Sequence, residues 1–157
     1  MPATQQGRPA VWVVLCLCAI GVGRAQSDEL ARKSHEAKQL MAAGRFVEAI
    51  PLYQELCRAL PSNTGLRLNL GLAYHMAGRQ AEAVPEFERV LKSDPGNGPA
   101  LISLGVALLE LNQPAKAVAP LEKVVAAQPS HAEARGYSRM RFYRWAATGR
   151  PPPSSGH

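Results

Sequence analysis

Cysteine is scarce in this chain of 157 residues, which excludes two common ways of stabilising a small domain. Two of the three cysteines, Cys16 and Cys18, lie in an apolar N-terminal segment that we expect to be removed, which leaves Cys57 alone. One cysteine forms no intrachain disulfide and no zinc cluster. Cys57 falls at helical spacing among Leu52, Tyr53, Leu56 and Leu60. We interpret it as a small buried hydrophobe, with a reactive thiol as the alternative.

The sequence also lacks the residue patterns of catalytic and metal sites. The four histidines, His35, His75, His131 and His157, are scattered, and none pairs at i, i+4 with a histidine or cysteine. There is no nucleophile elbow and no glycine-rich phosphate loop after a strand. We expect the carboxylates Glu82, Glu86 and Glu88 to lie on a solvated helix face. The sequence therefore predicts no enzyme, no cofactor and no metal site.

The net charge of +6 has a distribution that argues against nucleic-acid binding. Residues 26–131 hold eleven basic and eleven acidic side chains, so this part of the chain is neutral. The excess comes from Arg8 and Arg24 near the start and from five arginines against Glu133 near the end. A basic terminal segment is a weaker sign of a polyanion partner than a basic folded face.

Residues 1–25 have the order of a secretory signal peptide. The run from Ala10 to Val22 is almost entirely apolar, and Gly23 and Ala25 put small residues at the −3 and −1 positions before Gln26. At about 13 residues the run is short for a bilayer core of ~30 Å. We expect export to a bacterial periplasm or secretion, and the alternative is an uncleaved membrane anchor.

Three stretches of the chain repeat one another at a step of 34 residues, over 30–63, 64–97 and 98–131. The equivalent positions are Gly44, Gly78 and Asn112; Ala49, Ala83 and Ala117; Tyr53, Phe87 and Leu121; and Pro61, Pro95 and Pro129. A constant step of this length is typical of one helical hairpin copied side by side. The apolar pattern within each unit has the helical period, as in Leu66, Leu70, Ala73, Tyr74 and Ala77. The prediction is an all-α fold, an α-solenoid.

The ends of the helices are marked by turn residues. Gly44, Gly78 and Asn112 suit a left-handed turn after each first helix, and the prolines at 61, 95 and 129 end each second helix. We expect Ser62 and Asn97 to cap the next first helices, and Ser130 with Glu133 to form a capping box. Three prolines lie inside the second helices, where they should kink rather than break them: Pro51, Pro85 and Pro120. The alanines at 49, 83 and 117 must be small because the two helices of a hairpin touch there.

The chain resembles the tetratricopeptide repeat family. The second repeat carries the family signature most fully, with Leu70-Gly71 and Tyr74 followed by Gly78, Ala83, Phe87 and Pro95. The third keeps Leu104-Gly105, and the first has Glu36-Ala37 in that place, which suits a terminal unit.

Residues 132–147 begin a fourth unit, which we interpret as a capping helix, and we interpret 148–157 as a disordered tail. The expected capping helix carries the large apolar residues Tyr137, Met140, Phe142, Tyr143 and Trp145. An alternative is that this helix contacts a membrane interface.

The resemblance implies a right-handed superhelix whose inner face, lined by the first helices, binds peptides or protein segments. The lining positions would be Ala31, Ser34, Lys38, Met41 and Ala42, then Gly65, Leu68, Leu72, His75 and Met76, then Pro99, Ile102, Val106, Leu109 and Glu110. Asn69 matches one position of the clamp by which some members grip C-terminal carboxylates, but Ser34, Lys38, Pro99 and Ser103 occupy the others, so two required cations are missing. The groove should instead accept an apolar or amphipathic helix.

The function predicted from the sequence is that of an exported module that binds a partner protein, with a scaffold or assembly role. Two alternatives remain open. In the first, the chain is the non-catalytic leading domain, or a fragment, of a larger enzyme or sensor protein. In the second, it is a self-associating assembly factor, and its terminal helix or a second copy covers the apolar groove.

Overall fold

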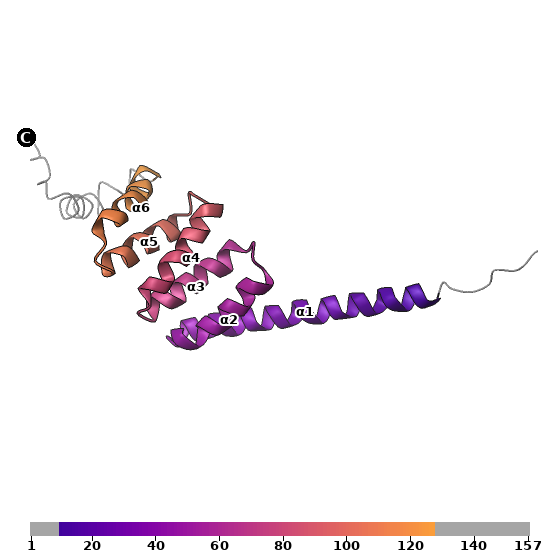
Figure 1. The fold of residues 1–157 in the computed structure, drawn as a ribbon. Coiled ribbons are helices and arrows are strands. Elements are labelled where there is room, and N and C mark those ends of the chain that lie inside the picture. Colours follow the sequence, from indigo (N-terminus) through magenta and orange to yellow (C-terminus); the bar gives the residue numbers. More distant parts are fainter. Residues whose placement is uncertain (1–9, 128–157) are drawn as a thin grey trace, which may run out of the picture.

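The computed structural model describes residues 10–127, which form six helices and no strand (Figure 1). The helices are α1 (Ala10–Ala42), α2 (Phe46–Ala59), α3 (Thr64–Met76), α4 (Gln80–Ser93), α5 (Gly98–Glu110) and α6 (Pro114–Ala127). Each helix packs on the next along the chain, so that the hairpins stand side by side in a row (Figure 1). The predicted all-α solenoid is confirmed over this part of the chain. The proposed capping helix, its capping box and the tail lie outside the described residues.

The turn inside each hairpin has the same geometry in all three units. Gly44 and Gly78 have φ of 73° and 75°, and Asn112 has φ of 56°, so the predicted left-handed turns are confirmed. In each turn the following N–H, that of Arg45, Arg79 or Gln113, donates to a carbonyl five residues back at 2.8 to 2.9 Å. This is the Schellman pattern, which satisfies carbonyls that a helix end would leave unpaired. Identical turns make the hairpins superimposable units.

The caps of the first helices agree with the prediction at one position and correct it at another. The Asn97 side chain accepts a hydrogen bond from the Ala100 N–H at 3.0 Å, as expected for an N-cap. The cap of α3 is Asn63, which accepts from Leu66 N–H at 3.0 Å, so the assignment of Ser62 was wrong by one residue. The correct choice keeps the 34-residue step, because Asn63 and Asn97 are equivalent.

The two helices of each hairpin approach closely at residues without bulk. Ala49, Ala83 and Ala117 are fully buried, as predicted. A methyl group added to Gly71 would come within 2.6 Å of the Phe87 ring, which is itself fully buried. The helices α3 and α4 can therefore touch at this distance only with glycine at position 71.

The internal prolines leave the second helices unbroken, as expected. Pro51 is the sixth residue of α2, Pro85 the sixth of α4 and Pro120 the seventh of α6. A proline at such a place has no N–H to donate to the carbonyl four residues earlier, so each costs its helix one backbone hydrogen bond and leaves the turns on either side in place.

Glu86 is buried, which corrects the prediction that it lies on a solvated face with Glu82 and Glu88. Only 8% of Glu86 is exposed, and its carboxylate pairs with Arg67 Nη1 of α3 at 3.0 Å and with Arg89 Nη1 of α4. Two guanidinium partners offset the cost of removing the carboxylate from water. The ion pair between Arg67 and Glu86 also links α3 to α4 at a fixed register.

The helix α1 is longer than the other first helices. It runs over 33 residues and joins the segment predicted to be a signal peptide to the first helix of the first repeat, extending well beyond the hairpins (Figure 1). No helix among the described residues combines the length and the apolar character that crossing a membrane requires. The first repeat packs through the part of α1 that includes fully buried Ala37.

The close approach at Gly71 leads to a prediction. Replacing Gly71 with Ala forces a methyl group against the buried Phe87 ring, so we expect the free energy of unfolding to fall by about 1–3 kcal/mol in urea titrations. Gly98→Ala is the control, because a methyl group there meets no atom within 4 Å and improves helix propensity. Equal stability of the two variants would contradict the packing described.

Candidate functional site

The residues predicted to line a binding face come from α1, α3 and α5, the first helices of the hairpins. On α3 and α5 they include six apolar residues, which we call the apolar stripe: Leu68, Leu72, Met76, Ile102, Val106 and Leu109. The three on each helix recur at intervals of three or four residues, so they follow one side of the helix. Since α3 and α5 are neighbours and point the same way, the two rows run beside each other.

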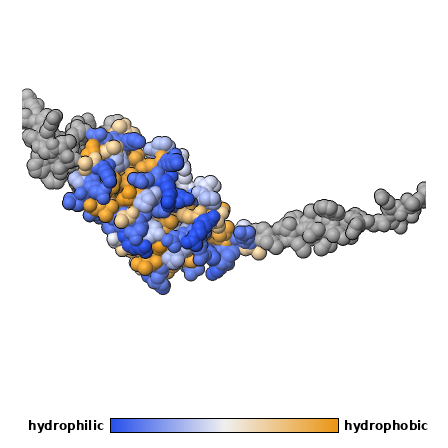
Figure 2. Space-filling view, in the orientation of Figure 1, coloured by the Kyte–Doolittle hydropathy of each residue, from blue (hydrophilic) through white to orange (hydrophobic). Residues whose placement is uncertain are grey.

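The apolar stripe is half covered by the protein itself. Met76 is 54% exposed, Ile102 47% and Val106 36%, although side chains of this kind are usually buried. The other members, Leu68, Leu72 and Leu109, are half-buried and pack against the core at their base. Figure 2 shows apolar residues reaching the surface in patches among polar ones on the face in view. The base of the apolar stripe therefore packs against the core, and its outer side is exposed to solvent.

The remaining predicted lining residues form a more polar margin. Lys38 is exposed on α1, and Met41 and Asn69 are half-buried. Ala31, Ala42, Gly65 and Pro99 are exposed and Ser34 is half-buried. The first-repeat side of this surface therefore carries mainly small side chains and one exposed cation, Lys38, and the side formed by the second and third repeats carries the apolar stripe.

His75 and Glu110 meet where α3 and α5 end. The imidazole Nδ1 of His75 lies 3.3 Å from Oε2 of Glu110, and the same oxygen accepts a hydrogen bond from the Gln80 side-chain amide at 3.0 Å. The Nδ1 atom is shielded from solvent and has no hydrogen-bond partner. These three side chains connect the second repeat to the third beside Met76 and Leu109.

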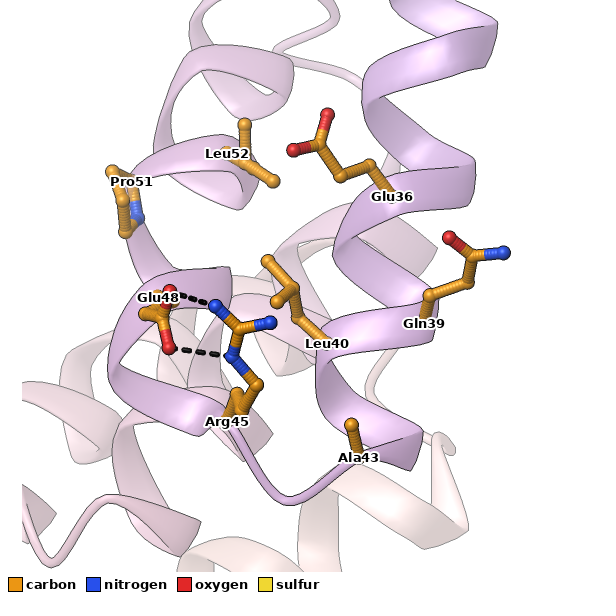
Figure 3. A pocket seen from close by; sticks show the side chains of 8 residues that line it. All are labelled: Glu36, Gln39, Leu40, Ala43, Arg45, Glu48, Pro51 and Leu52. Carbon is orange, nitrogen blue, oxygen red and sulfur yellow. Dashed lines mark hydrogen bonds and ion pairs between the residues drawn. The ribbon is translucent and has the colours of Figure 1, made fainter.

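A cavity of about 440 Å³ that sequence reasoning missed lies between α1 and α2 (Figure 3). Leu40, Leu52 and Pro51 supply apolar walls, and Glu36, Gln39 and Ala43 line it from α1 and the turn that follows. The Arg45 guanidinium donates to Glu48, with Nε 2.6 Å from Oε1. This hydrogen bond and the charge of Arg45 lower the pKa of the Glu48 carboxyl.

The side chains around this cavity suit an end of the array. Glu36 and Gln39 are exposed, whereas their equivalents Leu70 and Ala73 in the second repeat are buried. A terminal repeat needs a polar outer face because no further repeat covers it. Glu36 and Gln39 therefore indicate that this face of the first repeat is solvated. A comparison of residues 34 positions apart would have revealed this from the sequence.

A second hollow, of about 240 Å³, lies where α2 meets α3 and α4. Its walls include Cys57, which is 8% exposed, and burial raises the pKa of that thiol. The protonated, shielded thiol supports the interpretation of Cys57 as a core residue. Gln54 crosses the junction by donating to the Tyr74 hydroxyl at 2.6 Å.

Within residues 10–127, no group of three or more His, Cys, Asp or Glu side chains is arranged to hold a metal ion. The charged side chains on the hairpins occur mainly as ion pairs between neighbours, such as Lys33 Nζ with Glu55 Oε2 at 2.7 Å. The described hairpins therefore present a surface of ion pairs and apolar residues that another molecule can contact.

Comparisons with known proteins point to one family. A family model described as Tetratricopeptide repeat matches residues 36–98, and a second model with the same description matches 75–136. Together they span most of the three hairpins. No curated protein sequence matches the chain.

Several solved structures share the fold. MamA from Desulfovibrio magneticus RS-1 is 28% identical with a TM-score of 0.69, over 76% of this chain and 66% of that one. PcrH, solved in complex with the chaperone-binding region of PopD, is 19% identical with a TM-score of 0.66, over 76% and 94%. The first repeat domain of Spaghetti (RPAP3), bound to an HSP90 peptide, is 22% identical with a TM-score of 0.67, over 76% and 94%. The chain spans slightly less than two thirds of MamA.

Proposed function

The chain belongs to the tetratricopeptide repeat family, a family of protein-interaction modules, and we propose that it binds an apolar or amphipathic helix of a partner protein along its apolar stripe. Partner binding through this surface would give the protein a scaffold or assembly role.

One observation carries the proposal, which is the exposure of Met76, Ile102 and Val106 on two adjacent first helices. Full burial of an apolar side chain of this size contributes about 1.5–3 kcal/mol, and about half of that or less is left to gain here, because these three are 36% to 54% exposed. Three or more of them in a row supply a contact that a helix with apolar residues at i, i+3, i+4 and i+7 can cover. Met76 adds an unbranched side chain that adapts to different partner surfaces.

Similar folds give support of a general kind. PcrH with a region of PopD and the Spaghetti domain with an HSP90 peptide are folds like this one that hold a segment of another protein. The residues at the clamp positions argue against a chaperone tail as the partner here, because Ser34, Pro99 and Ser103 supply no charge. An apolar contact with polar margins at Lys38 and Glu110 fits the side chains better.

Two other roles compete with this proposal. The module is a non-catalytic interaction domain of a larger enzyme or sensor, or the apolar stripe is covered by residues 128–157 or by a second copy. The second role predicts self-association or an intramolecular contact in place of partner binding, and the variants below separate it from ours.

We also propose that the protein is exported. The apolar run before the small residues Gly23 and Ala25 supports this. Removal of the leader would leave the part of α1 that packs against α2, since Ala37 and its neighbours follow the proposed cleavage site.

A double substitution tests the binding surface. Leu72→Glu with Val106→Glu places two charges in the apolar stripe, so we expect at least a ten-fold loss of partner recovered by affinity capture from the native envelope (about 1.4 kcal/mol or more). Circular dichroism should show unchanged helicity. Ile102→Glu with Met76→Glu is a second pair at more exposed positions, which protects the test against misfolding.

Val47→Glu is the matched control, because Val47 is 64% exposed on α2 and lies outside the apolar stripe. It should leave capture unchanged. Full retention of the partner by both folded double variants would rule out the apolar stripe as the binding surface.

A second experiment tests export. N-terminal sequencing of the protein purified from its native host should begin at Gln26, the residue after the proposed cleavage site. A chain that retains residues 1–25 and fractionates with membranes would support the uncleaved anchor instead.

A further inference from the structure

We propose that three arginines at the second hollow, where α2, α3 and α4 meet, form a binding site for the phosphoryl group of inorganic phosphate or of a phosphate ester. The arginines are Arg58 of α2, Arg67 of α3 and Arg89 of α4. None of them belongs to the apolar stripe, so this inference goes beyond the proposed function and stands or fails independently of it.

The second hollow and the apolar stripe lie on opposite sides of α3. Arg67, Leu70 and Tyr74 line the second hollow and recur at intervals of three or four residues, so they share one side of the helix. Leu72 and Met76 of the apolar stripe each follow two residues after Leu70 and Tyr74, and two residues turn an α-helix by about 200°. A molecule bound in the second hollow therefore leaves the apolar stripe uncovered.

The second hollow carries more positive than negative charge. Glu86 is the one carboxylate among the described residues that line it. One of its oxygens accepts from Arg67 Nη1 at 3.0 Å, and the other accepts from Arg89 Nη1. Three guanidinium groups against one carboxylate leave an excess of two positive charges. A phosphoryl group carries about −1.5 to −2 at pH 7, so it matches this excess more closely than a single carboxylate does.

The guanidinium of Arg58 is available to an anion. Arg58 is exposed and forms no ion pair with a carboxylate of the described residues. The acidic side chain one turn earlier on α2, Glu55, pairs with Lys33 Nζ of α1 at 2.7 Å. A guanidinium offers five N–H donors in a planar fork whose geometry suits phosphate oxygens. Arg58 therefore brings donors that the fold itself does not use.

Other polar groups of the second hollow add to the donor set. The Tyr74 hydroxyl accepts a hydrogen bond from Gln54 Nε2 at 2.6 Å, so its own hydrogen can be donated to a ligand. Arg67 Nη2 donates to the Pro61 carbonyl at 3.4 Å, which helps to hold this guanidinium in place. A volume of about 240 Å³ has room for several water molecules, which a phosphoryl group can replace.

The third repeat shows that the fold does not require these charges. Leu101 and Pro120 stand 34 residues after Arg67 and Glu86, and both are buried. Apolar residues in place of a buried ion pair are often neutral or stabilising. Because the same hairpin forms with apolar residues at these two positions, we attribute the charges of the second hollow to the binding of an anion.

Titration with inorganic phosphate at constant ionic strength, followed by NMR of the arginine Nε–Hε resonances, tests the proposal. The resonances of Arg58, Arg67 and Arg89 should move together and give a dissociation constant of about 1 mM or lower. Acetate should bind at least about ten-fold more weakly, because it brings a single charge. Absence of phosphate binding, or equal binding of acetate, would overturn the proposal.

Glycerol 3-phosphate is the second probe, and it distinguishes the two sources of the phosphoryl group. Binding at least as tight as that of inorganic phosphate would support a phosphate ester whose remainder lies outside the second hollow. Binding of inorganic phosphate alone would support the free ion as the ligand.

Arg58→Gln removes a charge that no described carboxylate pairs with, so the fold should be kept while the affinity for phosphate falls at least about ten-fold. Lys92→Gln is the matched control, because Lys92 is the exposed equivalent of Arg58 on α4 and does not line the second hollow. It should leave the affinity unchanged. Equal affinities of the two variants for phosphate would contradict the assignment.

Glu86→Gln gives a second test with the opposite sign. The substitution removes the carboxylate that competes with the ligand and keeps an oxygen that can accept from Arg67. Phosphate should therefore bind this variant more tightly and raise its Tm by more than it raises the Tm of the unmodified chain. An equal or smaller increase in Tm would show that the anion does not occupy the second hollow.

Discussion

The structure depends on the close approach of the two helices in each hairpin. At the points of contact the side chains are reduced to a methyl group or a hydrogen, as at Ala83 and Gly71, and a large residue from the partner helix, such as Phe87, fills the space. No single hairpin has an interior, so the buried surface exists only because equal hairpins stand at equal spacing. The repeated left-handed turns at Gly44, Gly78 and Asn112 join the two helices of each hairpin in the same way.

The proposed binding surface follows from this packing. Each first helix uses one side to contact its partner and its neighbours, and the positions left over on α3 and α5 are occupied by the apolar stripe. Evolution of a solvated protein usually places polar residues at such positions, as it has at Glu36 and Gln39 on the outer face of the first repeat. This contrast between a polar end face and an apolar stripe is the basis of our proposal that a partner covers the apolar stripe.

Much of the fold could be predicted because a 34-residue step repeats each local signal three times. Ala49, Ala83 and Ala117 were predicted to be buried, and the turn residues predicted to be left-handed, on this comparison alone. Single-copy features were harder. Glu86 looked like a solvated carboxylate because its partner Arg67 lies on another helix, and the cap of α3 was placed at Ser62 because serine and asparagine both cap helices. The polar face around the cavity beside Leu40 shows in the 34-residue comparison, since Glu36 and Gln39 stand where the second repeat has Leu70 and Ala73. The contact of His75 with Glu110 arises from three-dimensional packing, so no pattern along the chain predicts it.

The central claim, that small residues set the distance between the two helices of a hairpin, is tested most directly by a matched pair of substitutions on α4. Ala83 is fully buried and Ala81 is exposed two residues earlier. Urea unfolding should show that Ala83→Leu lowers the free energy of unfolding by about 1–3 kcal/mol, while Ala81→Leu changes it by less than about 0.5 kcal/mol. Similar stabilities for the two variants would contradict the account.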